Sequence, residues 1–157
     1  MIELLMLAAL CVQEDAYYVE VVRTGGPVGA PFMAGTDGKR VHARGGYPDV
    51  EMGIREDDLE PHKGEKLGKM VKAFLPAKVK AQYGEPKKGA PYKYILRVWH
   101  KKDGKNEKVE VCVFRLTMGQ SDVWEKEVPQ EVKDLILYMG KIASWTLNPS
   151  TKKEGDE

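Results

Sequence analysis

The sequence lacks any run of 18 or more apolar residues and has little cysteine or histidine: two cysteines and three histidines among 157 residues. A helix that crosses a membrane needs about 20 predominantly apolar residues, so no segment is expected to span a membrane in that way. Cys11 and Cys112 stand in no CxxC or CxxH spacing, so neither a zinc site nor a redox pair has support. We therefore expect no metal site and no cofactor.

An excess of one charge is also missing. Charged residues make up 31% of the chain, but 25 Lys and Arg against 24 Asp and Glu leave a formal net charge of +1. Proteins that bind nucleic acid usually carry a basic excess on one element. The composition therefore predicts no nucleic-acid partner.

Sequence signatures of catalysis are absent as well. The chain contains no HExxH, GxSxG or Walker motif and no dinucleotide-binding fingerprint, each of which supplies a defined part of a catalytic or phosphate site. His62 and His100 are interpreted as solvated surface residues, and Cys112 as a small buried hydrophobic residue. No catalytic residue is expected, and the chain is predicted not to be an enzyme.

The N-terminal segment, residues 1–16, contains the short apolar run LLMLAALCV followed at once by QED. Such a run is too short to span a bilayer but suits the apolar part of a signal peptide, with Ala9 and Cys11 as the small residues before a cleavage point. Glu3 stands where a basic residue is usual, so an N-terminal strand or helix docked on the core is the alternative. The signal-peptide interpretation predicts a secreted or periplasmic protein.

A β-hairpin over residues 92–115 is the strongest structural signal. Asp103-Gly104 is a turn dipeptide between two runs rich in β-branched and aromatic residues, and its glycine adopts positive φ at little cost. Alternation along both arms predicts a sheet that is packed on one face and partly solvated on the other. The predicted inward residues are Tyr92, Tyr94, Leu96, Val98, Val109, Val111 and Val113.

Two further strands are predicted, over residues 17–23 and 49–54, because apolar residues alternate there. Residues 33–48 carry repeated glycines and are interpreted as a long, partly ordered loop or β excursion. Together with the hairpin, these strands predict an α+β fold in which a small antiparallel sheet of about four strands packs against two helices.

The first helix is expected to start at residues 57–61, DDLEP, and to end near Leu75, because acidic residues and proline favour a helix N-terminus. Gly64 and Gly68 should weaken it. The second helix is expected over residues 128–147. Apolar residues recur at helical spacing in both, and the predicted core positions are Leu67, Met70, Val71, Phe74, Val132, Leu135, Ile136, Met139, Ile142 and Ala143.

The chain is long enough for one domain with tails, which we assign to residues 17–147. Residues 148–157 are charged and lack apolar side chains, so a disordered tail is expected there. The domain is expected to be monomeric.

The corner after the first strand, residues 24–29, is the most unusual stretch. It contains three glycines and a proline in six residues, a composition that allows positive φ and close approach of another backbone while the proline fixes its own φ. A plain turn between two strands is the alternative interpretation.

This order of features resembles the emfourin family, small bacterial proteins also called protealysin inhibitors, which inhibit thermolysin-like zinc metalloproteases. The family typically shows an arginine, a small hydroxyl residue and two glycines at the end of the first strand, with another glycine shortly after. The residues that match are Arg23, Thr24, Gly25, Gly26 and Gly29. The resemblance covers roughly residues 17–145. The chain departs from the family in its glycine-rich segment 33–48 and in its extension before the first strand.

The resemblance implies reversible, non-covalent inhibition of a secreted metalloprotease by a rigid loop that enters the substrate cleft. Proline and fixed turns would lower the entropic cost of ordering that loop on binding. Val28 and Phe32 would fit an apolar specificity pocket, and Arg23 would face an acidic partner at the rim. The implied partner-binding residues are Arg23, Thr24, Gly25, Gly26, Pro27, Val28, Gly29 and Phe32.

Two other classes of function remain open from the sequence. One is an extracellular or periplasmic module that binds a different protein, through the same corner or through a face carrying Arg97 and Trp99. The other is a small enzyme whose site is assembled from dispersed residues.

Overall fold

The computed structural model describes six stretches of the chain, residues 16–25, 31–45, 54–86, 92–118, 121–124 and 127–147. They form one sheet of eight strands and two helices, so the α+β class is as expected. The helices are α2 (Pro61–Phe74) and α3 (Gln130–Leu147). The strands are β1 (Tyr17–Gly25), β2 (Phe32–Thr36), β3 (Arg40–Gly45), β4 (Ile54–Asp58), β5 (Gln82–Tyr83), β6 (Tyr92–Lys102), β7 (Lys105–Met118) and β8 (Ser121–Trp124).

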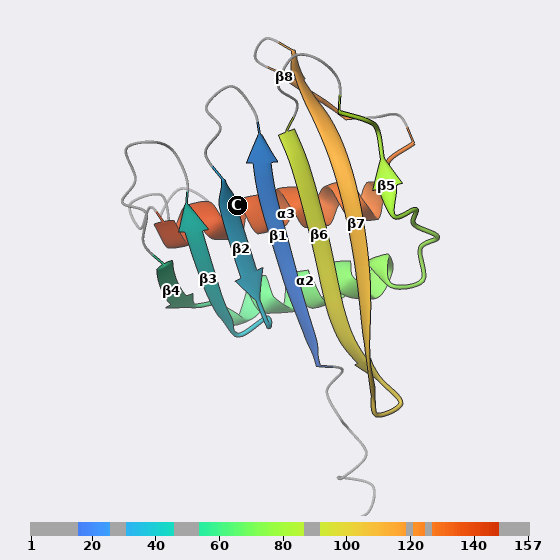
Figure 1. The fold of residues 1–157 in the computed structure, drawn as a ribbon. Helices are drawn as coiled ribbons and strands as arrows, with labels where there is room; N and C mark the ends of the chain where they lie inside the picture. The colour runs from blue at the N-terminus through green and yellow to red at the C-terminus, as the bar shows by residue number, and fades with distance from the viewer. Residues whose placement is uncertain are drawn as a thin grey trace, which may run out of the picture.

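The strands follow the order β4-β3-β2-β1-β6-β7-β5 across the sheet, and β8 pairs with the C-terminal part of β7. All pairs are antiparallel except that of β5 with β7, which is parallel. Both helices lie across the strands on one side of the sheet (Figure 1). We call this side the helix-covered face and the other side, over which no described helix lies, the open face.

The expectation of a small antiparallel sheet of about four strands is wrong, because the mixed sheet has eight. The glycine-rich segment 33–48 supplies most of β2 and β3, which pair with β1 and with each other. The connector between α2 and β6 supplies β5, and the segment after β7 supplies β8. β2 and β3 are rich in glycine, alanine or charged residues, and β5 and β8 have only two and four residues. None of them shows an extended apolar alternation of the kind that marks a strand in a sequence. Pairing with neighbouring strands places them in the sheet.

The segment before α2 is a strand rather than the expected helix entry. Asp57 and Asp58 belong to β4 at the edge of the sheet, and α2 begins only at Pro61, with no acidic residue in its first turn. Most of the strand predicted at 49–54 falls within residues 46–53, which lie outside the described residues. Carboxylates suit a helix N-terminus, but charged residues also suit an edge strand, where they oppose pairing with another chain.

The predicted hairpin is confirmed: its strands are β6, next to β1, and β7, next to the edge strand β5. β6 and β7 pair from Tyr92 opposite Arg115 down to Lys102 opposite Lys105. The turn residues Asp103 and Gly104 have φ of 51° and 76°, the pair of positive values that a type I′ turn requires. Every residue of β1 pairs with a residue on the other side of β6.

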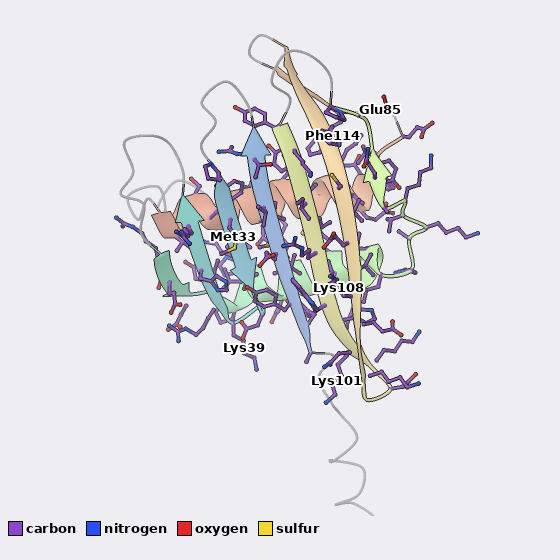
Figure 2. All side chains as sticks on the ribbon, in the orientation of Figure 1. Met33, Lys39, Glu85, Lys101, Lys108 and Phe114 are labelled. Atoms are coloured by element: carbon purple, nitrogen blue, oxygen red, sulfur yellow. The ribbon has the colours of Figure 1, made fainter. Side chains whose placement is uncertain are left out.

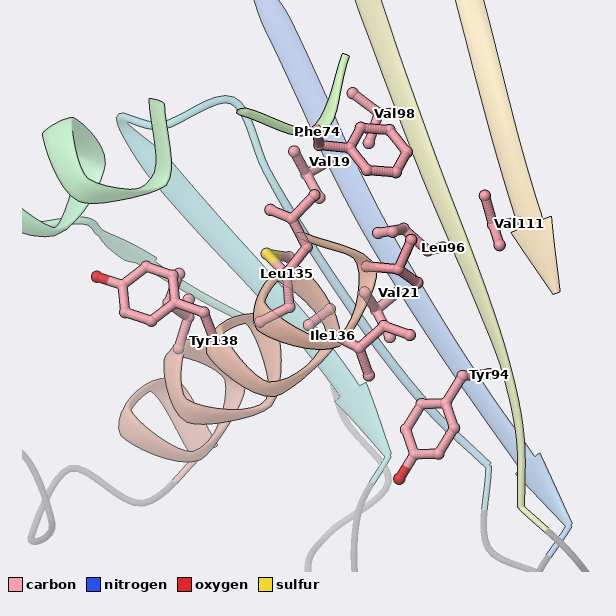
Figure 3. Close-up of a cluster of buried hydrophobic side chains, with 14 of the residues drawn as sticks. Val19, Val21, Phe74, Tyr94, Leu96, Val98, Val111, Leu135, Ile136 and Tyr138 are labelled. Atoms are coloured by element: carbon pink, nitrogen blue, oxygen red, sulfur yellow. The ribbon is translucent and has the colours of Figure 1, made fainter. Parts of the chain in front are cut away.

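The core lies between the helix-covered face and the two helices. The predicted inward residues of β6 and β7 lie on that face, and Leu96, Val98, Val111 and Val113 are fully buried there. The apolar stripes of both helices are confirmed, although Met70 is only partly buried. Figure 3 shows Leu135 and Ile136 of α3 directed toward the sheet. Neither of the described helices is long and apolar enough to cross a membrane.

Gly64 is a packing position rather than only a weak point of α2. A Cβ placed on Gly64 would overlap the backbone oxygen of Gly38, in the turn between β2 and β3. The hydroxyl of Tyr17 donates a hydrogen bond to the Gly64 carbonyl at 3.3 Å. Because Gly64 has no side chain, α2 can closely approach Tyr17 at the start of β1 and the β2–β3 turn.

We expect Gly64→Ala to lower the free energy of unfolding by about 1–3 kcal/mol, because α2 must move away from the Gly38 carbonyl. Gly140→Ala in α3 is the matched control: a Cβ there meets nothing within 4 Å, so the change should be neutral or stabilise by up to about 1 kcal/mol. Urea unfolding followed by circular dichroism measures both variants. Equal effects at the two glycines would contradict the close approach.

Candidate functional site

The corner implied by the sequence, residues 24–29, begins with Thr24 and Gly25, the last two residues of β1. Gly25 is exposed and has a φ of 79°, a value that side chains disfavour. It pairs with Tyr92, the first residue of β6, so it lies at one end of the sheet. In Figure 1 the end of β1 extends beyond α3. The remaining corner residues, Gly26, Pro27, Val28 and Gly29, lie outside the described residues.

Several strands begin or end at this same end of the sheet. Arg23 of β1 is paired with Phe32, the first residue of β2, and Phe32 is paired with Gly45, the last residue of β3. Gly45 also has positive φ, at 81°, and a Cβ on it would overlap the backbone oxygen of Pro31. Two strands thus end here in a glycine conformation, and we call this the loop end of the sheet.

Arg23 lies between two aromatic rings at the loop end. Its guanidinium carbon is 4.8 Å from the centroid of the Phe32 ring and 5.2 Å from that of Tyr92, within the range of a cation–π contact. The Nε atom of Arg23 is buried and has no hydrogen-bond partner. Neighbouring strands on both sides of β1 thus hold this half-buried arginine, and the expectation that it faces an acidic partner stays a prediction.

Phe32 does not occupy the position expected of a residue that fills a specificity pocket. Only 9% of its surface is exposed, and it belongs to the hydrophobic core. The Phe32 ring packs against the guanidinium of Arg23 and so stabilises the position of that side chain at the loop end. Thr24 lies half-buried on the open face, where it is paired with Lys93.

Two more aromatic residues, Tyr94 and Trp124, gather at the loop end beside Tyr92. The rings of Tyr92 and Tyr94 are 6.4 Å apart, and those of Tyr94 and Trp124 are 5.9 Å apart. Tyr92 and Trp124 remain half-buried. The sequence predicts both tyrosines in the core. It does not predict the contact of Tyr94 with Trp124, because that contact depends on the pairing of β8 with β7.

The alternative face with Arg97 and Trp99 is the open face, and its polar groups bind one another. Arg97 donates hydrogen bonds to Glu20 at 2.7 Å and to Glu110 at 2.8 Å. These two bonds raise the pKa of Arg97 above its ordinary value, and the bond to Glu110 has the larger effect. The charge of Arg97 is thus largely neutralised within the chain.

Aromatic residues extend this network across the open face. The ring of Tyr18 lies 5.5 Å from that of Trp99, and its hydroxyl is hydrogen-bonded to Nε2 of His42 at 2.7 Å. Tyr18 reaches His42, two strands away, over Gly35 of β2, where a Cβ would overlap the Tyr18 hydroxyl. Gly35 is therefore required for this contact.

An apolar row crosses the open face between the polar network and the loop end. The register aligns Met33 of β2 with Val22 of β1, Ile95 of β6 and Cys112 of β7. All four are half-buried, and burial raises the pKa of the Cys112 thiol, which makes it a poor nucleophile. Figure 2 shows Met33 on this face, with Phe114 nearer the loop end.

Two concave sites in the described part of the chain are small. A groove of about 240 Å³ between α2 and α3 is lined by Lys66, Met70 and Asp134 among others, and a pocket of about 20 Å³ beside Lys63 has room for roughly one water. Both are smaller than the sites that usually hold drug-sized ligands. The described residues contain no group of three or more His, Cys, Asp or Glu that could hold a metal ion.

His100 is not the solvated residue expected from its place near the hairpin turn. Only 11% of its side chain is exposed, and its Nε2 lies 3.3 Å from a carboxylate oxygen of Glu107. His62 is 66% exposed, as expected.

We expect Tyr18 to make stability fall at high pH. Burial, and secondly the charge of Glu20, raise the pKa of Tyr18 from 10.0 to about 12. The unfolded chain therefore loses this proton first. The contribution of the protonated Tyr18 hydroxyl to the free energy of unfolding is fully present below pH 10 and is lost as the pH rises toward 12. Urea unfolding at pH 9, 10 and 11 should show a smaller decline for Tyr18→Phe than for the wild-type chain, and equal declines would contradict the assignment.

Comparisons with protein-family models, with curated proteins and with solved structures found no match to this chain. The site must therefore be interpreted from its own residues and their arrangement.

Proposed function

We propose that this chain is a protein inhibitor of a thermolysin-like zinc metalloprotease and that it binds non-covalently through the corner that starts at Thr24 and Gly25. The observation that carries the proposal is the position of Gly25, which is exposed, has positive φ and ends β1 at the loop end of the sheet. The match of Arg23, Thr24, Gly25, Gly26 and Gly29 to the emfourin pattern supports the same corner.

The framework around the corner suits such a role. β1 is paired with β2 as far as Arg23 and with β6 as far as Gly25. The chain is thus held on both sides up to Arg23 and on one side where it enters the corner. A partner's backbone can approach Gly25 closely because it has no side chain, and Pro27 restricts the conformations that must be ordered on binding. Pre-organisation of this kind strengthens binding by lowering its entropic cost.

The target in this proposal is a secreted enzyme, and the inhibitor is proposed to be secreted or periplasmic too. The apolar run within residues 1–16, with Ala9 and Cys11 as the small residues before a cleavage point, supports export. An exported inhibitor would meet its target outside the cytoplasm.

A protein-binding module with a different extracellular or periplasmic partner is the second candidate. The apolar row on the open face, formed by Met33, Val22, Ile95 and Cys112, favours it because contiguous apolar surface is typical of interaction sites. The Arg97 and Trp99 positions support it less well, since both side chains already bind within the chain.

Titration of a thermolysin-like protease with the purified chain tests the proposal. We expect peptide hydrolysis to fall to a low residual rate at micromolar inhibitor. Unchanged hydrolysis at that concentration would reject the inhibitor function and leave the protein-binding module.

A second experiment locates the binding surface. Gly25→Asn keeps the positive φ, which asparagine tolerates, but adds a side chain where the partner's backbone would approach. We expect inhibition to weaken by roughly 10- to 100-fold, as for residues that dominate an interface, with little loss of thermal stability.

Gly104→Asn is the matched control for that variant. Gly104 has nearly the same φ, 76°, and lies at the hairpin turn, at the opposite end of β6 from the loop end. A Cβ there meets nothing within 4 Å, so inhibition should be unchanged. If Gly25→Asn inhibits as well as Gly104→Asn, the corner is not the binding surface.

A further inference from the structure

Arg23 is a half-buried cation that has no carboxylate partner within the described residues. Its Nε is buried without a hydrogen bond, and its guanidinium contacts the rings of Phe32 and Tyr92. A charge taken out of water without a partner is unfavourable, and cation–π contacts offset only part of that cost.

Two other cations of this fold, Lys63 and Arg97, are each paired with a carboxylate. Nζ of Lys63 lies 3.2 Å from a carboxylate oxygen of Glu60. Arg97 binds two carboxylates. Within the described residues, no such carboxylate pairs with the guanidinium of Arg23.

The two rings fix the position of Arg23. Phe32 is part of the core, and Tyr92 pairs with Gly25 at the start of β6. A stacked guanidinium loses little conformational freedom when it binds, and its planar donors match the two oxygens of a carboxylate. The rings also limit the access of water, which strengthens a charged hydrogen bond.

We propose that Arg23, held between Phe32 and Tyr92, is a binding site for a carboxylate group of the partner protein. The proposal deepens the proposed function, on which it rests for the partner: an acidic side chain of the metalloprotease binds the arginine while the neighbouring corner contacts the cleft. The carboxylate approaches from the loop end, where Arg23 and Tyr92 retain part of their exposure.

Inhibition of a thermolysin-like protease by charge-matched variants tests this site. Arg23→Gln should weaken inhibition roughly 10- to 100-fold. Lys93→Gln, which removes the same charge beside Thr24 but on the open face, should change it less than about 3-fold. Equal losses in the two variants would show a general charge effect and overturn the proposal, and so would full inhibition by Arg23→Gln.

Variants that keep the fold separate binding from stability. Arg23→Lys retains the charge but not the planar fork, and should weaken inhibition with little change in thermal unfolding. Tyr92→Phe keeps the ring and should inhibit like the wild-type chain, whereas Tyr92→Leu should lose affinity as Arg23→Gln does. Wild-type inhibition by both Arg23→Lys and Tyr92→Leu would overturn the site.

A measurement without the protease separates failure of the site from failure of the proposed function. The Arg23 Nε–Hε resonance of the ¹⁵N-labelled full chain is followed during titration with sodium acetate and, at equal ionic strength, with sodium chloride. We expect a saturable shift with acetate only, which Tyr92→Leu abolishes. If the chain inhibits no protease but shows this shift, the proposed function is wrong and the carboxylate site stands. No acetate-specific shift overturns the site.

Discussion

Pairing of β1 with β6 is the constraint on which the rest of this structure depends. It joins the first strand to a hairpin more than seventy residues later and fixes three features through one register. Val21 opposite Leu96 builds the core, Glu20 opposite Arg97 builds the polar network of the open face, and Gly25 opposite Tyr92 sets the loop end. A shift of one residue would turn every side chain of β1 to the wrong face.

The two faces of the sheet differ in what covers them. On the helix-covered face, α2 and α3 bury the apolar residues, and Gly64 lets α2 come close enough to the β2–β3 turn. On the open face, charged and aromatic side chains contact one another. Tyr18, for example, is hydrogen-bonded to His42 across Gly35. Glycine positions thus control close contact on both faces, although neither glycine stands in a turn.

The loop end combines support from neighbouring strands with a partly buried arginine. Phe32 and Tyr92 hold Arg23 from the strands on either side of β1, and Gly25 ends that strand in a conformation that favours glycine. Within the described residues no carboxylate pairs with the guanidinium of Arg23, and a partly buried charge without such a partner costs stability. The corner and Arg23 are adjacent in sequence, yet they contribute differently, one by lacking side chains and the other by a fixed charge.

The sequence by itself determined the elements that depend on near neighbours. Asp103-Gly104 specified the hairpin turn, and helical spacing specified the buried stripes from Leu67 to Phe74 and from Val132 to Ala143. It also marked the glycine-rich corner as unusual, because composition alone shows where a backbone can adopt positive φ.

Only the tertiary structure decided the size of the sheet and the surroundings of the site. β2, β3, β5 and β8 are strands because neighbours pair with them, and Asp57 and Asp58 lie in an edge strand instead of a helix start for the same reason. The contacts of Arg23 with Phe32 and Tyr92 depend on two strand registers at once. Local pattern cannot reveal such contacts, because their free energy comes from residues that are distant in sequence and become neighbours only in the folded sheet.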